Sequence, residues 1–406
     1  MGLLFKDELL DEFGTWALAY IPFGGPDFGE IAAVGAATGD GGTDAFYAAW
    51  IAAGDRVEAE ALAAAAKGRA ADARDLFLRA SVHYNSAYHP LYGAPTDPRL
   101  VAAYRKQIAA MNSGLALFDP PILPLMIPFE GASMSAYFIP AEGRAQEVRP
   151  LVIFTNGYDA TVTDLYFASA VAASRHGFHS LIFDGPGQGA MLYEQGVPIR
   201  PDWETVVTAV VDFALELPFV DPARIALNGW SFGGYLAARA ATGEHRLAAL
   251  VCDPALLGLA EGFRALATKF GAGADEVADL GTLTPETRQA IEAVITGNPG
   301  LNWKIVQRGL WVNGLPTIGD FLAASESFTL KGRIGDIRCP VMMTLAEADP
   351  LAQQADTVAA ELTVPHTIIR FTAAEGAADH CEMRNRSLLN RRSFAWLDAV
   401  FAGEVR

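Results

Sequence analysis

The sequence predicts an α/β protein with a mostly parallel, doubly wound sheet, a helical N-terminal domain and a helical cap insertion. In residues 119–406, short apolar runs alternate with stretches of helical length, as expected for strands that are buried on both faces. Residues 1–118 instead carry Ala-rich patterns with the period of a helix. A long segment at about 256–337 interrupts the alternation and predicts a cap above the carboxyl ends of the strands.

The N-terminal domain is expected to be a set of amphipathic helices. Residues 45–66 and 70–88 are the clearest of them, and another helix is expected from Asp97 to about Ser113. The second helix carries its larger side chains along one stripe, formed by Ala73, Leu76, Phe77, Ala80 and Tyr84. This stripe is expected to be buried.

The second domain is expected to begin with a β-hairpin, because residues 123–128 and 134–140 alternate around Glu130-Gly131. Further strands are expected at the apolar runs 151–155, 180–183, 225–227, 249–252, 341–345 and 367–371. A helix from Ser387 to Phe401 ends the chain. The aromatic residues of the cap insertion are expected either above the site or in a core of the cap itself.

Composition excludes several classes of function. The chain has 406 residues, a net charge of −17 and a pI near 4.8, which argues against nucleic acid or an anionic membrane as a partner. Three cysteines are too few and odd in number for a disulfide framework. The N-terminus turns acidic at once, and no apolar run is long enough for a membrane helix. These features predict a cytoplasmic protein.

A serine between two glycines carries the strongest chemical signal. Gly229-Trp230-Ser231-Phe232-Gly233 lies between the apolar run at 225–227 and an Ala-rich helical pattern. A strand, a sharp turn with a serine and then a helix is the context in which G-x-S-x-G marks a nucleophile. The turn leaves no room for a Cβ two residues either side of the serine. Ser231 is therefore predicted to be the nucleophile.

An activated serine needs a base, and the base needs an acid to orient it. Asp349 follows the strand predicted at 341–345 and is the candidate acid, with Glu347 as its rival. His380 follows the last predicted strand and is the candidate base. His366 precedes that strand and lies on the wrong side of it.

The oxyanion formed by such a serine needs fixed hydrogen-bond donors. The backbone N–H of Phe232 is one candidate, and the N–H of Tyr158 in the loop Asn156-Gly157-Tyr158-Asp159 is the other. The glycine-rich segment 184–189 is interpreted as a structural turn, because it lacks the Lys-Ser/Thr ending of a phosphate loop. No zinc spacing or dinucleotide fingerprint is found, and no cofactor is expected.

With these motifs the chain resembles the FrsA-like serine hydrolases of the α/β-hydrolase superfamily. Within that family it is most similar to the group of 2,6-dihydroxypseudooxynicotine hydrolase and the fungal yellowish-green-pigment hydrolases. The resemblance covers nearly the whole chain. Its markers include the segments 156–161, 183–189, 229–234 and 379–381.

The resemblance implies a Ser231-Asp349-His380 triad, a helical N-terminal domain across the catalytic mouth, and a homodimer. It also implies a small, flat, partly aromatic substrate, cut at a carbon–carbon bond next to a ketone or at an ester. Asp164 stands where relatives place an acidic residue after the oxyanion loop. Candidate substrate-binding residues are Asp164, Tyr84, Trp230 and Trp303.

Two other functions stay open at this point. One is transfer of the acyl group to an acceptor other than water, as in an acyltransferase or cyclase of the same fold. The other is a non-catalytic ligand-binding protein on a hydrolase scaffold. Such binding proteins usually lose a member of the triad, whereas all three positions are filled here.

Overall fold

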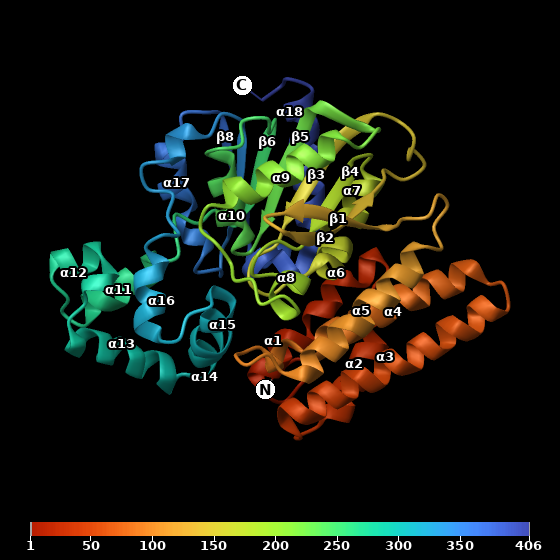
Figure 1. The fold of residues 1–406 in the computed structure, drawn as a ribbon, viewed down its shortest axis with the longest axis horizontal. Helices are drawn as coiled ribbons and strands as arrows, with labels where there is room; N and C mark the ends of the chain where they lie inside the picture. The colour runs from red at the N-terminus through yellow and green to blue at the C-terminus, as the bar shows by residue number, and fades with distance from the viewer. Residues whose placement is uncertain (1, 406) are drawn as a thin grey trace.

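The computed structural model describes residues 2–405, and within them eight strands form one mixed sheet in the order β1-β2-β4-β3-β5-β6-β7-β8 (Figure 1). The first three strands in this order pair antiparallel, and all others pair parallel. The strands are β1 (Pro124–Phe129), β2 (Ala132–Ile139), β3 (Arg149–Thr155), β4 (His179–Phe183), β5 (Val220–Trp230), β6 (Ala249–Asp253), β7 (Val341–Ala346) and β8 (His366–Phe371).

The expected hairpin and the six expected runs are all strands, so the predicted fold class is confirmed. β5 begins earlier than expected, at Val220. Its first residues include the polar Asp221 and Pro222, which hide the strand from an apolar pattern. Val220 pairs with Arg149 at the start of β3, and the register shifts between Arg149 and Leu151.

Helices cover both faces of the sheet. In Figure 1, α9 and α10 lie in front of the sheet, and α7 and α18 pack against each other on the other face. The helical segments around the sheet are α6 (Val162–Leu165), η3 (Tyr166–Ala170), α7 (Val171–Arg175), α8 (Gly189–Tyr193), α9 (Trp203–Leu215), α10 (Gly233–Ala241), η6 (Ile334–Asp336), η7 (Ala352–Gln354), α17 (Ala355–Glu361), η8 (Ala373–Glu375), η9 (His380–Asn385) and α18 (Arg386–Phe401).

The N-terminal part of the chain is helical and lies below the sheet in Figure 1, at the edge where α6 and α8 follow their strands. Most of its large side chains belong to the same hydrophobic core as the sheet, whereas Tyr84 and Phe77 lie in smaller clusters between the helices. Its segments are α1 (Glu8–Gly14), η1 (Trp16–Phe23), α2 (Phe28–Thr38), α3 (Gly42–Ala66), α4 (Ala70–Ala87), η2 (His89–Leu91) and α5 (Pro98–Leu115).

The segment between β6 and β7 forms a second helical layer, drawn in teal in Figure 1. It has a small core of its own, which includes Ile291, Ile295 and Leu322. Phe263 packs against this small core, as expected for an aromatic residue in a core of the cap itself, whereas Trp303 and Trp311 join the main core. Its segments are α11 (Glu261–Lys269), α12 (Ala274–Ala278), η4 (Leu280–Thr282), α13 (Pro285–Gly297), α14 (Pro299–Leu301), η5 (Asn302–Gly309), α15 (Leu310–Asn313) and α16 (Ile318–Ser325).

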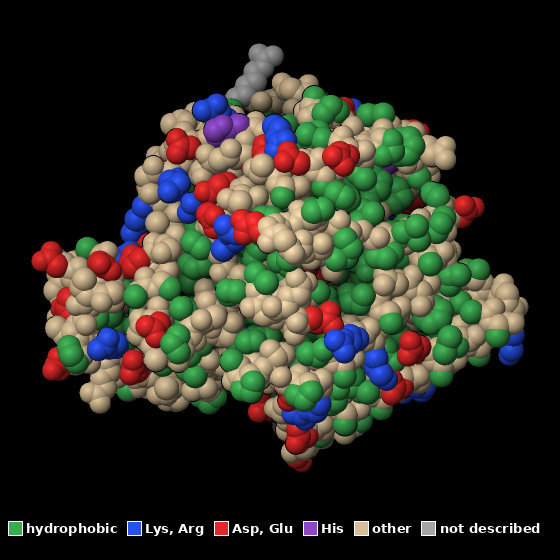
Figure 2. All heavy atoms as spheres, in the orientation of Figure 1, with side chains coloured by type: hydrophobic (Ala, Val, Ile, Leu, Met, Phe, Trp, Pro, Cys, Tyr) green, Lys and Arg blue, Asp and Glu red, His purple; other side chains and the backbone are tan. Residues whose placement is uncertain are grey.

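The N-terminal helices and the cap touch each other below the sheet. The Trp311 indole N–H donates to Thr96 Oγ1 at 3.2 Å, and Gln307 Nε2 donates to the Pro90 carbonyl at 2.7 Å. The surface carries both charge signs, and acidic side chains are prominent over the cap at the left of Figure 2. Among the described residues, no helix combines the length and the apolar character needed to cross a membrane.

Candidate active site

Ser231 occupies a strained turn between β5 and α10. Its φ is +60°, a conformation that is uncommon for a residue with a side chain. A Cβ on Gly229 would lie 1.9 Å from the Gly233 carbonyl oxygen, and a Cβ on Gly233 would lie 2.5 Å from the Thr155 carbonyl oxygen. Both glycines are therefore required by close packing of the helix against the strands. The turn holds the Ser231 hydroxyl at the carboxyl edge of the sheet.

Three side chains from separate loops form a hydrogen-bonded chain at this edge. Ser231 Oγ lies 2.9 Å from His380 Nε2, and His380 Nδ1 lies 2.7 Å from Asp349 Oδ2. Asp349 is 2% exposed, and its other oxygen accepts from the Leu351 N–H at 3.0 Å. With a proton on Nδ1 facing Asp349, Nε2 is free to accept the proton of Ser231. Glu347, the rival acid, instead accepts from the Ala373 N–H.

The surroundings of His380 favour its charged form. Desolvation lowers the pKa of the imidazole, but the hydrogen bond and charge of Asp349 raise it, as do the charges of Asp253 and Asp159. The net effect is a pKa above the ordinary histidine value. An imidazolium formed during a reaction would be stabilised by the same groups.

A buried acidic pair lies behind the serine turn. The Asp253 carbonyl accepts from the Ser231 N–H at 2.6 Å, and its carboxylate accepts from Arg386 Nη1 at 2.8 Å. Glu382 is fully buried beside Asp253, and burial raises its pKa well above the ordinary glutamate value. Glu382 and Cys381 both have positive φ, so this tight turn after His380 fixes where the imidazole points.

The loop after β3 approaches the serine turn closely. A Cβ on Gly157 would lie 2.7 Å from the Phe232 nitrogen, so a glycine is needed here for contact. The Tyr158 and Phe232 rings stack with centroids 4.8 Å apart. Among residues 2–405, the backbone N–H groups of Tyr158 and Phe232 do not donate a hydrogen bond to any protein group. Two unused donors beside a hydroxyl suit an oxygen that gains negative charge.

The glycine-rich segment 184–189 supports this loop. Gln188 Nε2 donates to the carbonyls of Asn156 and Gly157, at 2.7 Å and 3.1 Å. Asn156 Nδ2 donates to Asp184 Oδ1 at 2.9 Å. Burial raises the pKa of Asp184 well above its ordinary value. The segment is a structural turn that fixes the position of the loop, in agreement with its interpretation from sequence.

An ion pair joins the same loop to the cap. Arg308 Nη1 lies 2.5 Å from Asp159 Oδ2, and each side chain is 14% exposed. The Arg308 guanidinium lies over the rings of Tyr158 and Trp303. Burial raises the pKa of Tyr158 to about 12, against the opposing effects of Asn313 and Arg308. The Tyr158 hydroxyl is therefore neutral at ordinary pH.

Three of the predicted substrate-binding side chains, Trp230, Trp303 and Asp164, differ in their surroundings. Trp230 adjoins the serine, with the Arg386 guanidinium 5.1 Å from its ring centre, and Trp303 packs beside Arg308. Asp164 is 1% exposed, and it accepts from Tyr20, Asn85 and the Thr161 N–H. Both of its oxygens are thus occupied by protein groups.

Tyr84 does not lie near Ser231 or the other predicted site residues. It lies between α3 and α4, where its hydroxyl donates to Asp55 and Glu58 and its ring fills the space above Gly54. The stripe pattern that marked its helix face as buried was correct for Ala73, Phe77, Ala80 and Tyr84. That burial is against a neighbouring helix.

A family model described as "Alpha/beta hydrolase family" matches residues 152–386, more than half of the chain. The chain belongs to the alpha/beta hydrolase family. It is 30% identical to 20-hydroxy-prefusarin hydrolase FUS2 of Gibberella moniliformis over 98% of this chain and 96% of that protein. It is 36% identical to hydrolase acrC of Aspergillus aculeatus over 58% of this chain and 59% of that protein.

Solved structures agree on the fold of this hydrolase. The crystal structure of 2,6-dihydroxy-pseudo-oxynicotine hydrolase matches with a TM-score of 0.74 at 20% identity, covering 96% of this chain and 97% of that chain. The match extends over both the N-terminal helices and the sheet. The resemblance drawn from the motifs is confirmed at the level of family and fold.

Several residues at the site of this hydrolase were missed from sequence. Asp253 ends β6, and the rule that functional residues follow the carboxyl ends of parallel strands was a usable signal for it. Asp159 lies in the loop after β3, beside the predicted donor Tyr158, but was not itself predicted. Arg308 lies within the cap in a segment without a motif, so the sequence carried no signal for it.

Proposed function

We propose that this protein is a serine hydrolase that uses Ser231, His380 and Asp349 to form an acyl-enzyme intermediate. The observation that carries the proposal is the chain of two short hydrogen bonds, 2.9 Å and 2.7 Å, that joins the three side chains. Nucleophile, base and orienting acid in this arrangement are the requirement for acyl transfer. The family membership supports the same chemistry.

In the proposed reaction, His380 Nε2 takes the proton of Ser231 while Oγ bonds to the carbonyl carbon of the substrate. The N–H groups of Phe232 and Tyr158 hold the oxyanion of the tetrahedral intermediate. The bond from that carbon to the leaving group then breaks, and the leaving group takes the proton from the His380 imidazolium. Water attacks the acyl-enzyme by the same route and releases Ser231.

The proposed substrate is a small, flat, partly aromatic molecule with a ketone or ester carbonyl. Aromatic rings lie beside the serine turn, where the Tyr158 ring stacks on that of Phe232. The name of the relative from Gibberella moniliformis states hydrolysis of 20-hydroxy-prefusarin, which supports a small-molecule substrate here. For carbon–carbon cleavage, the leaving carbanion must be delocalised, as in a β-diketone or an acylphenol.

Labelling and kinetics of Ser231→Ala test the proposal. A fluorophosphonate probe should form one stoichiometric adduct with the wild type, and a panel of aryl esters, β-diketones and acylphenols should identify the bond that is cut. The variant should lose labelling and at least ~10³-fold in kcat. Ser327→Ala removes an exposed serine of the cap-to-sheet connection and should behave as wild type. Turnover by Ser231→Ala at the wild-type rate would exclude the mechanism.

A further inference from the structure

We infer that Arg308 binds an anionic oxygen of the substrate, an enolate or phenolate oxygen conjugated with the bond that breaks. Arg308 would thereby favour carbon–carbon cleavage over the hydrolysis of neutral esters. The inference rests on the proposed serine hydrolase function and names the substrate class of that site.

Arg308 is held in a fixed orientation beside the oxyanion loop. Its guanidinium carbon lies 4.9 Å from the centre of the Tyr158 ring and 5.2 Å from that of the Trp303 ring. A planar cation between two ring faces keeps its direction. Tyr158 contributes a proposed oxyanion donor, so Arg308 packs against a residue that would hold the reacting carbonyl. The Tyr92 hydroxyl, which donates to the Asp159 carbonyl at 2.9 Å, fixes the same loop.

The hydrogen-bonding capacity of Arg308 is mostly unused. A guanidinium has five N–H donors, and within residues 2–405 the recorded hydrogen bond is from Nη1 to Asp159 Oδ2. Among the same residues, Nε and Asp159 Oδ1 are buried without a partner. Nη2 makes no hydrogen bond within these residues and is not one of the buried atoms. Nη2 is therefore the nitrogen that a substrate oxygen reaches.

Two other arginines of this molecule form complete two-point pairs, whereas Arg239 and Arg386, like Arg308, have a buried Nε without a partner among residues 2–405. Arg200 donates to both oxygens of Asp202 at 2.7 Å each, and Arg246 donates to both oxygens of Glu244 at 2.8 Å and 2.5 Å. Those arginine side chains are 27% and 40% exposed, against 14% for Arg308. Arg308 is the least exposed of these three arginines, yet it makes the fewest hydrogen bonds to its carboxylate. An N–H donor without a partner destabilises the protein more when it is buried. An acceptor from a ligand would offset that cost.

The local charge makes a cation at this position useful. The carboxylates of Asp349, Asp253 and Asp159 all act on His380, so an anionic leaving group would be repelled from the site. Arg386 is engaged behind the serine turn by Asp253. Arg308 lies on the side of the oxyanion loop, where its charge opposes this repulsion.

The chemistry of carbon–carbon cleavage needs such a cation. When the bond from the acyl carbon breaks, its electron pair moves to the leaving carbon and on to the conjugated oxygen, which becomes an enolate or phenolate. Arg308 Nη2 stabilises that oxygen, and the His380 imidazolium then delivers its proton to the carbon. An alkyl ester expels an alcohol whose own oxygen takes the imidazolium proton, so no second cation is needed at a conjugated oxygen.

Kinetics of Arg308→Met provide the first test. The kcat/KM for a β-diketone or acylphenol should fall on the order of 10²-fold, whereas that for a neutral alkyl ester should change less than about threefold. Arg308→Lys should recover part of the loss because it keeps the charge. Lys304→Met, in the same segment but paired with Glu12 at 3.3 Å, should match wild type. An equal loss on both substrate classes would overturn the inference.

Binding to the inactive enzyme gives the second test, which does not require turnover. On a Ser231→Ala background, an o-acylphenol and its methyl ether are titrated by calorimetry, with and without Arg308→Met. The variant should weaken binding of the ionisable phenol on the order of tenfold and leave the ether unchanged. No difference between the two compounds would overturn the inference. Aryl esters hydrolysed at wild-type rates by Ser231→Ala alone would instead contradict the proposed function.

Discussion

The charges of three carboxylates, Asp349, Asp253 and Asp159, act on His380. Of these, Asp159 is the one outside the proposed triad and the serine turn. Because Asp159 helps to raise the pKa of His380, and His380 must be neutral to accept a proton, the acid limb of the pH profile should lie above pH 6.5, the ordinary histidine value. Asp159→Asn removes one negative charge and leaves Arg308 uncompensated. Both changes lower the pKa of His380.

The expected result is therefore an acid limb at lower pH in Asp159→Asn than in wild type. The measurement is kcat/KM against pH at constant ionic strength, with a neutral aryl ester. Asp356→Asn, which changes an exposed charge paired with Arg370, should leave the limb in place. A limb that does not move in Asp159→Asn would show that this charge is screened from His380.

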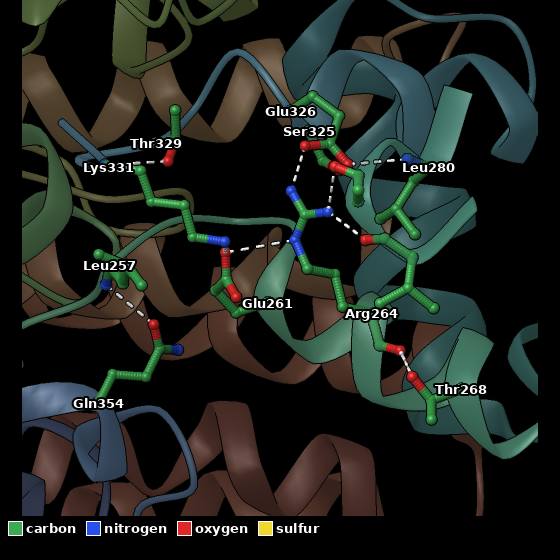
Figure 3. Close-up of polar contacts among 12 residues, drawn as sticks. Leu257, Glu261, Arg264, Thr268, Leu280, Ser325, Glu326, Thr329, Lys331 and Gln354 are labelled. Carbon is green, nitrogen blue, oxygen red and sulfur yellow. Dashed lines mark hydrogen bonds and ion pairs between the residues drawn. The ribbon is translucent and has the colours of Figure 1, made fainter. Parts of the chain in front are cut away.

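The cap is organised around one arginine of α11, shown in Figure 3. Arg264 donates to the carbonyls of Val277 and Ala278 at the end of α12, and pairs with Glu326 after α16. Glu326 also accepts from the Leu280 N–H at 2.9 Å. One side chain thus joins three segments that are distant in sequence, and it is 14% exposed.

Arg264→Met should loosen the cap locally. Loss of these bonds leaves Glu326 and two carbonyls without their partner, which costs about 1–3 kcal/mol. Hydrogen exchange of the Leu280 amide should accelerate, while amides of β3 and β5 stay protected. Arg288→Met, at an exposed position of α13, is the control in the same cap. Unchanged exchange at Leu280 would mean that the cap core alone holds these segments.

The N-terminal helices are joined to the sheet domain through Asp164. Its carboxylate accepts from Tyr20 of η1 at 2.7 Å and from Asn85 of α4 at 2.7 Å. It also caps α6 by accepting from the Thr161 N–H at 2.8 Å. The resemblance suggested contact with substrate, whereas these bonds give Asp164 a role in joining the two parts of the molecule.

Asp164→Asn should therefore lower stability more than activity. An amide in place of a carboxylate loses acceptors for buried donors, and the free energy of unfolding should fall by about 2–4 kcal/mol. Thermal or urea unfolding measures the loss, and kcat per folded molecule on a neutral ester should change less than about threefold. Asp75→Asn, at a side chain that is 57% exposed, should leave the unfolding midpoint unchanged. Full stability with a large drop in kcat would favour substrate contact instead.

Much of the architecture follows from local patterns in the chain. The central strands were predictable because parallel strands buried on both faces are continuous apolar runs. The serine turn was predictable because its tight geometry excludes a Cβ at Gly229 and Gly233. The partners of Ser231 could be expected because each follows a strand, although Ser231 and His380 are 149 residues apart.

Other features were decided by tertiary packing alone. Asp159 and Arg308 are also 149 residues apart, but neither belongs to a local pattern that points to the other. Tyr84 and Asp164 had the side chains expected at a substrate site, and neighbouring helices supplied partners for both. Local sequence determines periodicity and turns through short-range sterics, whereas the environment of a side chain depends on contacts between distant segments. That is why sequence alone determined the fold and the proposed triad, and only the folded chain revealed the Arg308 cation beside the loop after β3.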